Sequence, residues 1–182
     1  MKVIETGFNG LYIIEPQVFE DERGCFFESY NLQKMTGHGL DAKFVQDNES
    51  KSEYGVIRGL HYQLEPFAQT KLLRVVQGKI LDIALDLRLK STTYGSYYAA
   101  ELSSENKRQF YIPKGFAHGF SVLSQEAIVN YKCDNYYNKS AEHGVNINDS
   151  KLQINWQIEK SKQIISKKDR LLPQIIDAVS FL

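Results

Sequence analysis

The stretch from Ile80 to Leu87 reads I-L-D-I-A-L-D-L and contains the clearest structural pattern in the chain. One of its two alternating faces is wholly aliphatic and consists of Leu81, Ile83, Leu85 and Leu87, and the other carries Asp82, Ala84 and Asp86. A period of two is typical of a β-strand. Gly78-Lys79 stands between this run and the apolar run before it, which predicts a hairpin.

Short runs of the same kind recur along the 182 residues, separated by Gly, Asn, Asp and Ser. Besides 80–87, the predicted strands cover 11–15, 25–30, 44–47, 72–77, 97–102, 109–113, 119–123 and 127–133. Helical periodicity is convincing only near the ends, as one turn at 32–35 and a helix at 171–181. Such closely spaced strands predict a mostly β sandwich or barrel. We find no linker or repeat, so residues 1–182 are expected to form a single domain.

The composition argues against several classes of partner. The 22 Lys and Arg residues balance the 22 Asp and Glu residues, so the formal net charge is zero. A neutral chain does not point to nucleic acid or an anionic membrane as partner, and any anion-binding patch must be local. The first residues form no secretory signal and no window approaches a membrane span. We therefore expect a cytoplasmic protein.

Two cysteines, Cys25 and Cys133, lie far apart in the sequence and follow no metal-ligand spacing. We interpret both as buried thiols in a reducing compartment, and a single disulfide between them stays open as the alternative.

The stretch V-I-R-G-L-H-Y-Q at residues 56–63 is the first candidate for chemistry. Histidine exchanges a proton near neutral pH, and an arginine binds anions in its planar fork. On a regular strand, Arg58 would share a face with Leu60 and Tyr62, and His61 would point the other way with Gly59 and Gln63. Taken alone, a core histidine beside a surface arginine is the simpler interpretation.

Other polar residues occur inside strand-like runs. Lys71 opens K-L-L-R-V-V-Q-G, and if it points into a barrel then Asp82 is a plausible counter-ion. His118 follows a tight turn in P-K-G-F-A-H, and Tyr131 lies in A-I-V-N-Y-K-C. The segment S-K-K-D at 166–169 is typical of a polar turn or a helix N-cap. Each of these has an ordinary structural explanation when considered singly.

Together, His61 after a strand and His118 in P-x-G-x-x-H resemble the two half-motifs of the cupin superfamily, a jelly-roll barrel with its site inside. Many cupins hold a metal with H-x-H, an acid and a later histidine. Here Gln63 replaces the second histidine and Lys71 replaces the acid. An ammonium has no lone pair for a metal and repels it, so the resemblance argues against a metal-dependent cupin.

Within the cupins, the motifs resemble one family closely. They are F-V-Q-D-N at 44–48, G-V-I-R-G-L-H-Y-Q at 55–63, D-L-R-x-x-S-x-T-Y-G at 86–95, I-P-K-G-F-A-H-G-F at 112–120, Y-K-C-x-N-Y-Y at 131–137 and S-K-K-D at 166–169. The chain is similar from about residue 21 to Asp169 to the dTDP-4-dehydrorhamnose 3,5-epimerases. This resemblance implies a double-stranded β-helix, or jelly-roll, with short helices near its ends.

The resemblance also implies a cofactor-free and metal-free epimerisation of a dTDP-4-keto-6-deoxyhexose at C3 and C5. His61 would be the base, Asp169 would orient it, Tyr131 would be the acid on the opposite face, and Lys71 would stabilise the enolate. The substrate-binding positions that it implies are Arg23, Phe26, Glu28, Gln46, Asn48, Arg58, His118, Tyr137, Glu142 and Lys168. It further implies a homodimer in which the early segment, with Arg23, Phe26 and Glu28, reaches into the partner's site.

Three function classes are therefore compared. The first is the cofactor-free epimerase, and the second is a metal-dependent cupin, which Gln63 and Lys71 disfavour. The third is a jelly-roll that only binds a sugar nucleotide, which would not need a base, an orienting carboxylate, an acid and a cation together. Within the first class, epimerisation at C3 alone or a ketone shift remains the alternative to inversion at both carbons.

Overall fold

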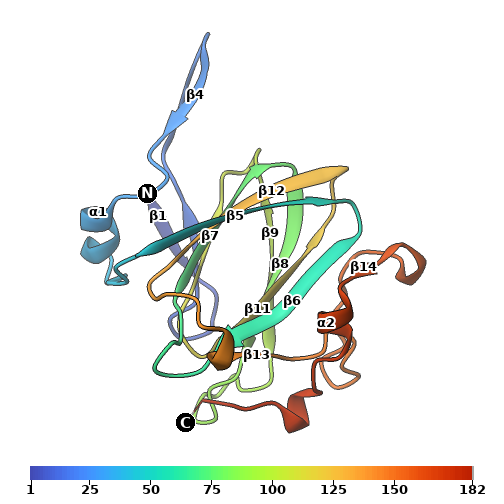
Figure 1. Cartoon of the computed structure of the whole chain (residues 1–182). Helices are drawn as coiled ribbons and strands as arrows, with labels where there is room; N and C mark the ends of the chain where they lie inside the picture. The colour runs from blue at the N-terminus through green and yellow to red at the C-terminus, as the bar shows by residue number, and fades with distance from the viewer. Residues whose placement is uncertain (182) are drawn as a thin grey trace.

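The structure is a computed structural model that describes residues 1–181. Two antiparallel sheets face each other and form a barrel (Figure 1). The first sheet has the order β1 (Lys2–Glu5), β2 (Tyr12–Glu15), β10 (Gln109–Ile112), β7 (Lys71–Gln77), β12 (Glu126–Cys133) and β5 (Gln46–Glu53). The second has the order β13 (Glu142–Gly144), β6 (Val56–Gln63), β11 (Phe116–Val122), β8 (Lys79–Asp86) and β9 (Tyr97–Ser103), and β14 (Ile164–Ile165) pairs with β6.

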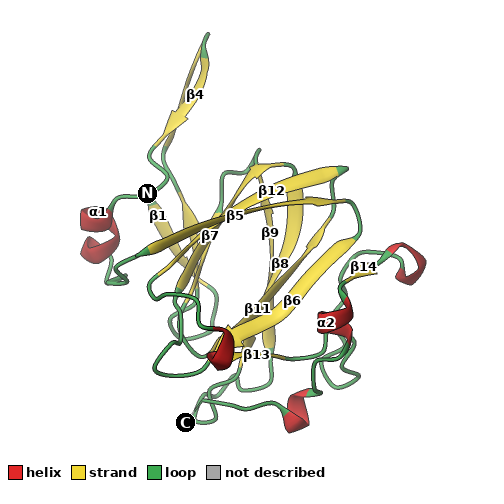
Figure 2. Cartoon of the chain, viewed as in Figure 1, coloured by secondary structure: helices red, strands yellow, loops and turns green. Residues whose placement is uncertain are grey.

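Helices are few and short, as Figure 2 shows. They are α1 (Leu32–Gly37), α2 (Lys167–Arg170) and three 3₁₀ turns, η1 (Lys139–Ala141), η2 (Lys160–Lys162) and η3 (Ile175–Asp177). Strands β3 (Val18–Asp21) and β4 (Gly24–Phe27) pair only with each other and project from the barrel as a ribbon (Figure 1). Within residues 1–181, no helix has the length and apolar character needed to cross a membrane. The predicted mostly β jelly-roll with short helices near its ends is confirmed.

The two faces of β8 enter two different cores, which explains its alternating pattern. Ile80 and Ala84 point between the sheets, where they join a cluster with Phe110. The aliphatic face, including Ile83, packs instead against Trp156 under the C-terminal segment. Almost every residue of β8 is therefore buried, including Asp82 and Asp86 on the inner face. Burial of apolar side chains on both faces is the main source of stability for such a strand.

The hairpin predicted at Gly78-Lys79 is wrong. Strands β7 and β8 follow each other with only Gly78 between them, but they belong to different sheets and do not pair. Gly78 has φ of 80°, and a Cβ there would lie 2.1 Å from the carbonyl oxygen of Glu126. Glycine is therefore required at this point, where the chain crosses from one sheet to the other.

Strand β5 is twice as long as predicted, because it covers Gln46–Glu53 rather than 44–47. Its sequence Q-D-N-E-S-K-S-E has no apolar face, so hydrophobic alternation could not identify it. The alternation is nevertheless present, with amides and hydroxyls facing inward and charged residues facing outward. The inward side chains are polar because they line a cavity.

The C-terminal helix predicted at 171–181 is also wrong, since only η3 is helical there. The backbone of this segment bonds to the barrel instead. The Phe181 N–H donates to the carbonyl of Leu87, and the Tyr62 hydroxyl donates to the carbonyl of Val179 at 2.6 Å. Because these groups are satisfied by other elements, the segment lies extended across the second sheet.

A buried carboxylate fixes the loop after β8. Asp86 is fully buried and accepts bonds from the Arg88 backbone N–H and guanidinium and from the Ser91 and Thr93 hydroxyls. The Arg88 guanidinium also lies 4.4 Å from the centre of the Phe116 ring. Burial raises the pKa of the Asp86 carboxyl, but these hydrogen bonds lower it overall, so the carboxyl is ionised at neutral pH.

We expect Asp86→Ala to lower the free energy of unfolding by about 3–5 kcal/mol, because it removes a fully buried carboxylate that binds the partly buried Arg88 guanidinium and two hydroxyls. Chemical denaturation measures this. Glu159→Gln is the control, because Glu159 forms an exposed pair with Lys162, and its loss should cost less than about 1 kcal/mol. Equal effects for the two variants would contradict the role assigned to Asp86.

Candidate active site

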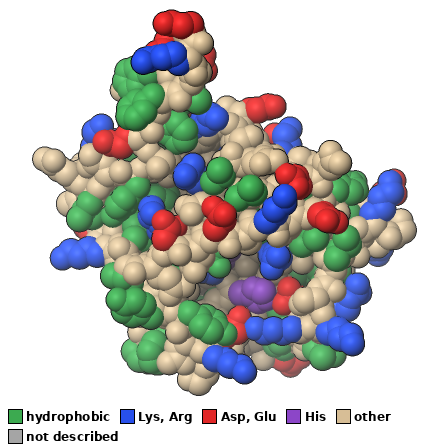
Figure 3. Space-filling view, turned by 45° about the horizontal axis from the view of Figure 1, so that its top comes forward, with side chains coloured by type: hydrophobic (Ala, Val, Ile, Leu, Met, Phe, Trp, Pro, Cys, Tyr) green, Lys and Arg blue, Asp and Glu red, His purple; other side chains and the backbone are tan. Residues whose placement is uncertain are grey.

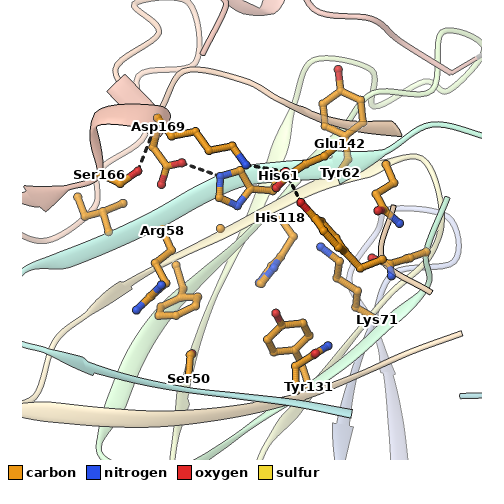
Figure 4. Close-up of a pocket in the computed structure, with 18 of the residues that line it drawn as sticks. Ser50, Arg58, His61, Tyr62, Lys71, His118, Tyr131, Glu142, Ser166 and Asp169 are labelled. Carbon is orange, nitrogen blue, oxygen red and sulfur yellow. Dashed lines mark hydrogen bonds and ion pairs between the residues drawn. The ribbon is translucent and has the colours of Figure 1, made fainter. Parts of the chain in front are cut away.

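A cavity of about 760 Å³ opens between the two sheets. Its walls come from β5 and β12 on one side and from β6 and β11 on the other, and β7, β13 and α2 complete it. Figure 3 shows histidine atoms at the bottom of this hollow, with charged side chains of both signs around its edge. Figure 4 shows the side chains that project into it.

A β-bulge in β6 brings Arg58 and His61 to the same side of the sheet. His118 of β11 is opposite His61, and Phe120 is opposite Arg58, so β6 has one extra residue in this interval. Both side chains line the cavity (Figure 4). The prediction that Arg58 points away from His61 is therefore wrong, because it assumed a regular strand.

The bulge depends on two facing glycines. A Cβ on Gly59, which has φ of 125°, would lie 2.5 Å from the Cα of Gly119. A Cβ on Gly119 would lie 2.6 Å from the carbonyl oxygen of Arg58. Only two glycines allow the two backbones to come this close.

His61 is paired with Asp169, as the sequence predicts. Its Nε2 lies 2.7 Å from Asp169 Oδ1, and the side chain of Asp169 is only 6% exposed. Asp169 also accepts a bond from the Gly59 N–H, and Ser166 caps the N-terminus of α2. Burial raises the pKa of the Asp169 carboxyl, but the bonds from His61 and Gly59 lower it overall. The ionised carboxylate therefore holds the Nε2 proton and leaves Nδ1 as the basic nitrogen.

Tyr131 projects into the cavity from β12, on the side opposite to His61 (Figure 4). Burial raises the pKa of its hydroxyl, with a further contribution from Cys133, so the hydroxyl keeps its proton at neutral pH. An imidazole from one sheet and a protonated phenol from the other thus face the same space.

Lys71 and His118 both project into the cavity (Figure 4). Burial lowers the pKa of Lys71, and charge interactions with Cys133, Asp82 and Glu142 oppose this effect. The counter-ion arrangement differs from the expected one, because Asp82 Oδ1 bonds to His118 Nε2 at 2.7 Å. Both members of this pair are almost completely buried. Among residues 1–181, two imidazole–carboxylate pairs therefore present a histidine to the cavity, and one pair is open while the other is enclosed.

The remaining predicted residues of the cavity form its rim and one wall. Glu142 accepts bonds from the Tyr137 hydroxyl and the Lys168 ammonium. Gln46 and Asn48 bond to each other at 3.0 Å along the inner face of β5. Within residues 1–181, these side chains and those above bring together eleven of the predicted positions: Gln46, Asn48, Arg58, His61, Lys71, His118, Tyr131, Tyr137, Glu142, Lys168 and Asp169.

Three predicted binding residues do not reach this cavity in the single chain. Arg23 and Phe26 lie on the projecting ribbon, where Phe26 is 70% exposed, and Glu28 follows directly after it. Arg23 forms an exposed ion pair with Asp21. Cys25 on the same ribbon is exposed, so its predicted burial is wrong, because β4 pairs with β3 outside the barrel.

Sequence reasoning missed several residues that line the cavity or support it. Ser52 accepts a bond from Arg58 Nε at 3.0 Å, and Ser50 and Gln69 line the cavity. Cys133, which is buried as predicted, lines it too, and burial raises the pKa of its thiol to about 11. Three of these residues, Ser50, Ser52 and Cys133, lie on the inner faces of β5 and β12, and they can be identified only when the strand register is known. Both cysteines are free, which resolves the open question of a disulfide.

Gln63 occupies the position of a metal ligand in other cupins, but its side chain is fully engaged. Its Nε2 donates to the carbonyls of Phe67 and Tyr136, and its Oε1 accepts from the Asn138 N–H. Within residues 1–181, no group of three or more His, Cys, Asp or Glu side chains is arranged to hold a metal ion. The side chains present at these positions do not fit a metal centre.

Comparison with known proteins agrees with this geometry. A family model described as dTDP-4-dehydrorhamnose 3,5-epimerase matches residues 5–177. A relative of that name from Shigella flexneri is 48% identical, and the alignment covers 100% of both chains. The crystal structure of dTDP-4-dehydrorhamnose 3,5-epimerase from Elizabethkingia anophelis matches with a TM-score of 0.93 and 53% identity, covering 97% of each chain.

A structure with a bound sugar nucleotide is similarly close. It is dTDP-6-deoxy-D-glucose-3,5-epimerase from Legionella pneumophila in complex with dTDP-4-keto-L-rhamnose, with a TM-score of 0.92 and 44% identity. The match covers 97% of this chain and 93% of that one. The resemblance inferred from the motifs is confirmed, as are the jelly-roll fold and the isomerase class. The chain belongs to the dTDP-4-dehydrorhamnose 3,5-epimerase family.

Proposed function

We propose that this protein converts dTDP-4-keto-6-deoxy-D-glucose to dTDP-4-keto-L-rhamnose by inverting C3 and C5. The observation that carries this proposal is the placement of His61 and Tyr131 on opposite sheets of one cavity, with Lys71 between the sheets. Inversion requires that a proton leaves one face of a carbon and that another arrives on the opposite face. The substrate class is supported by the relative whose structure contains dTDP-4-keto-L-rhamnose.

The base in this reaction is His61. The 4-ketone acidifies the hydrogens on C3 and C5, so Nδ1 of His61 removes one of them and the C–H electron pair moves into the enolate. The imidazolium that forms is stabilised by the ionised Asp169 at 2.7 Å. A solvent molecule then takes up the proton and restores the base.

Lys71 and Tyr131 complete the step. The enolate carries negative charge on the former ketone oxygen, and the Lys71 ammonium stabilises this charge inside the cavity. By analogy with oxyanion holes, a positioned charge of this kind stabilises the transition state by about 3–4 kcal/mol. The Tyr131 hydroxyl then donates its proton to the opposite face of the carbon, and the resulting phenolate is reprotonated from solvent.

The substrate is held by groups that suit a sugar nucleotide. Arg58 offers both terminal nitrogens to the diphosphate, because its Nε is held by Ser52. Tyr137, at the rim and 55% exposed, offers its ring for stacking with thymine. The other groups that bind the nucleotide and orient the sugar are Gln46, Asn48, His118, Glu142 and Lys168.

The protein acts as a homodimer in which the β3–β4 ribbon completes the partner's site. This assembly is supported by the ribbon itself, which projects from the barrel with Phe19 and Phe26 more than half exposed. Exposed aromatic side chains on a projecting ribbon are typical of a surface that a partner covers. In the partner's cavity, Arg23 would then reach the diphosphate and Phe26 would reach the thymine base. Glu28 would reach the polar groups nearby.

The reaction proposed here needs neither a metal nor a redox cofactor, because two stereocentres change without net oxidation and Lys71 supplies the positive charge. The free thiols of Cys25 and Cys133 support a cytoplasmic location, where thiols remain reduced.

We expect His61→Ala to lower kcat by about a thousandfold, because it removes the base. The measurement is proton exchange at C3 and C5 in heavy water, followed by NMR. His38→Ala, at the exposed end of α1, is the control and should retain normal activity. Near-normal exchange in His61→Ala with an unchanged melting temperature would overturn the assignment of the base.

The second prediction concerns Tyr131→Phe, which keeps the ring and removes only the proton donor. Net epimerisation should slow by about a hundredfold or more, while deuterium exchange at the substrate carbons continues. Tyr54→Phe, on the exposed surface, is the matched control. Equal loss of exchange and epimerisation would show that Tyr131 acts before the enolate forms.

The third prediction tests the ribbon exchange. Arg23→Ala and His61→Ala chains should each be inactive alone, but a refolded 1:1 mixture should recover about a quarter of normal activity. Half of the dimers are then mixed, and one of their two sites combines an intact His61 with the partner's intact Arg23. Absence of recovery in a mixture shown to contain mixed dimers would place Arg23 in its own chain's site.

A further inference from the structure

Behind His118, one of the residues that line the cavity, is a buried carboxylate to which the proposed reaction assigns no task. Asp82 on β8 is completely buried, and its Oδ1 lies 2.7 Å from His118 Nε2. Its other oxygen, Oδ2, is buried without a hydrogen-bond partner among residues 1–181. A buried carboxylate oxygen that lacks a donor is costly, so its presence requires an explanation.

In the described part of the chain, Lys71 in turn lacks a carboxylate partner for its ammonium. Among residues 1–181, no carboxylate lies within ion-pair distance of its ammonium, although the side chain is partly buried and lines the cavity. The ammonium projects into the same cavity as the His118 ring (Figure 4), its charge acts on that ring, and the ring is bonded to Asp82. Asp82 and Lys71 thus both act on the same imidazole, Asp82 through a hydrogen bond and Lys71 through its charge.

A purely structural role explains the Asp82–His118 bond poorly. Strands β8 and β11 are already joined along seven paired positions, from Phe116 opposite Asp86 to Val122 opposite Ile80. A side-chain bond between two strands paired over this length adds little to holding them together. An aliphatic pair would pack at the same place without burying a charge.

We propose that Asp82 is a positioning residue of the reaction: it fixes the orientation and tautomer of His118 and supplies the charge that keeps the Lys71 ammonium protonated beside the enolate. The proposal rests on the proposed function, because it assigns Asp82 a task only if Lys71 stabilises the enolate.

The tautomer follows from the hydrogen bond. Burial lowers the pKa of His118, Asp82 raises it, and the positive charges of Lys71 and His61 lower it; the pKa is lowered overall, so the ring is neutral. Its single proton then lies on Nε2, which donates to Asp82. Nδ1 is left as an acceptor for a substrate hydroxyl or for the Lys71 ammonium. The second imidazole is therefore held in the form that cannot compete with Tyr131 as an acid.

The charge of Asp82 matters because the other groups around Lys71 do not replace it. The groups that face Lys71 are His61, Asp82, His118, Tyr131, Cys133 and Glu142. His118, Tyr131 and Cys133 are neutral at pH 7, and Glu142 is already paired with Lys168 at the rim. His61 becomes positive during the reaction. Asp82, bonded to the neutral His118, is therefore a buried negative charge that has no cationic partner among residues 1–181.

Asp82→Asn tests the proposal, because an amide has the size of the carboxylate but no charge. The protein is labelled with ¹⁵N at lysine and histidine and titrated by NMR without substrate. We expect the midpoint of the Lys71 Nζ titration to fall by about one pH unit or more, and the His118 ring shifts to report a changed tautomer population.

Turnover gives the second measurement. The alkaline limb of the kcat/KM profile should move to lower pH by the same amount, with about a tenfold loss of kcat above that limb. Asp149→Asn is the matched control, because Asp149 is a buried carboxylate outside the cavity that accepts from the backbone N–H groups of Lys151 and Ile175. It should lower the melting temperature without moving the Lys71 midpoint or the alkaline limb.

Each outcome has a distinct meaning. Unchanged Lys71 and His118 titrations in Asp82→Asn, with only a lower melting temperature, would overturn the proposal and leave a structural role. Shifted titrations in a protein that does not exchange C3 or C5 protons even in its wild-type form would overturn the proposed function instead. If Asp82→Asn does not fold, Asp82→Glu provides the test, since it keeps the charge and should keep the Lys71 midpoint within about half a unit.

Discussion

The hydrogen bond between His61 and Asp169 is the interaction on which the site depends. It joins two residues 108 positions apart, one on a central strand and one on a four-residue helix near the end of the chain. A helix this short is not stable alone, so its position comes from the Ser166 cap and from the pairing of β14 with β6 just before it. The C-terminal segment therefore has to cover the second sheet before His61 obtains the carboxylate that makes it a base.

The two imidazole–carboxylate pairs have the same geometry but different environments. Both bonds measure 2.7 Å, and the two histidines face each other across the β6–β11 ladder. The His61 side chain is 31% exposed, so a proton that it removes can pass to solvent. The His118 pair is enclosed, and a charged imidazole there would lack hydration and lie close to Lys71. The difference in burial thus suits His61 to proton transfer in the proposed reaction and suits His118 to act as a fixed hydrogen-bond acceptor.

The sequence was sufficient for the fold class and for most of the site, because spaced motifs identify residues that a jelly-roll brings together. It failed where tertiary structure overrides local pattern. The inner face of β5 is polar because it lines the cavity, so no hydrophobic period marks it. The Gly78 turn connects two sheets rather than two paired strands. The bulge that places Arg58 beside His61 requires Gly59 on β6 and Gly119 on β11. The sequence of β6 contains only the first of these glycines, so it does not reveal the bulge.

His61 lies on one sheet and Tyr131 on the other, and this arrangement limits how the proposed reaction can invert both C3 and C5. His61 and Tyr131 project from paired strands of opposite sheets, so the backbone positions of the two side chains are fixed by the barrel. In the proposed reaction the base and the acid therefore keep their places, and the sugar ring would have to turn or shift to present C3 and C5 in succession to the same pair. The groups that hold the nucleotide lie at the rim and on the polar wall, outside this rigid interior. They anchor the substrate at one end while the sugar moves, and the shape of the space beside Lys71 then decides whether the second carbon reaches His61.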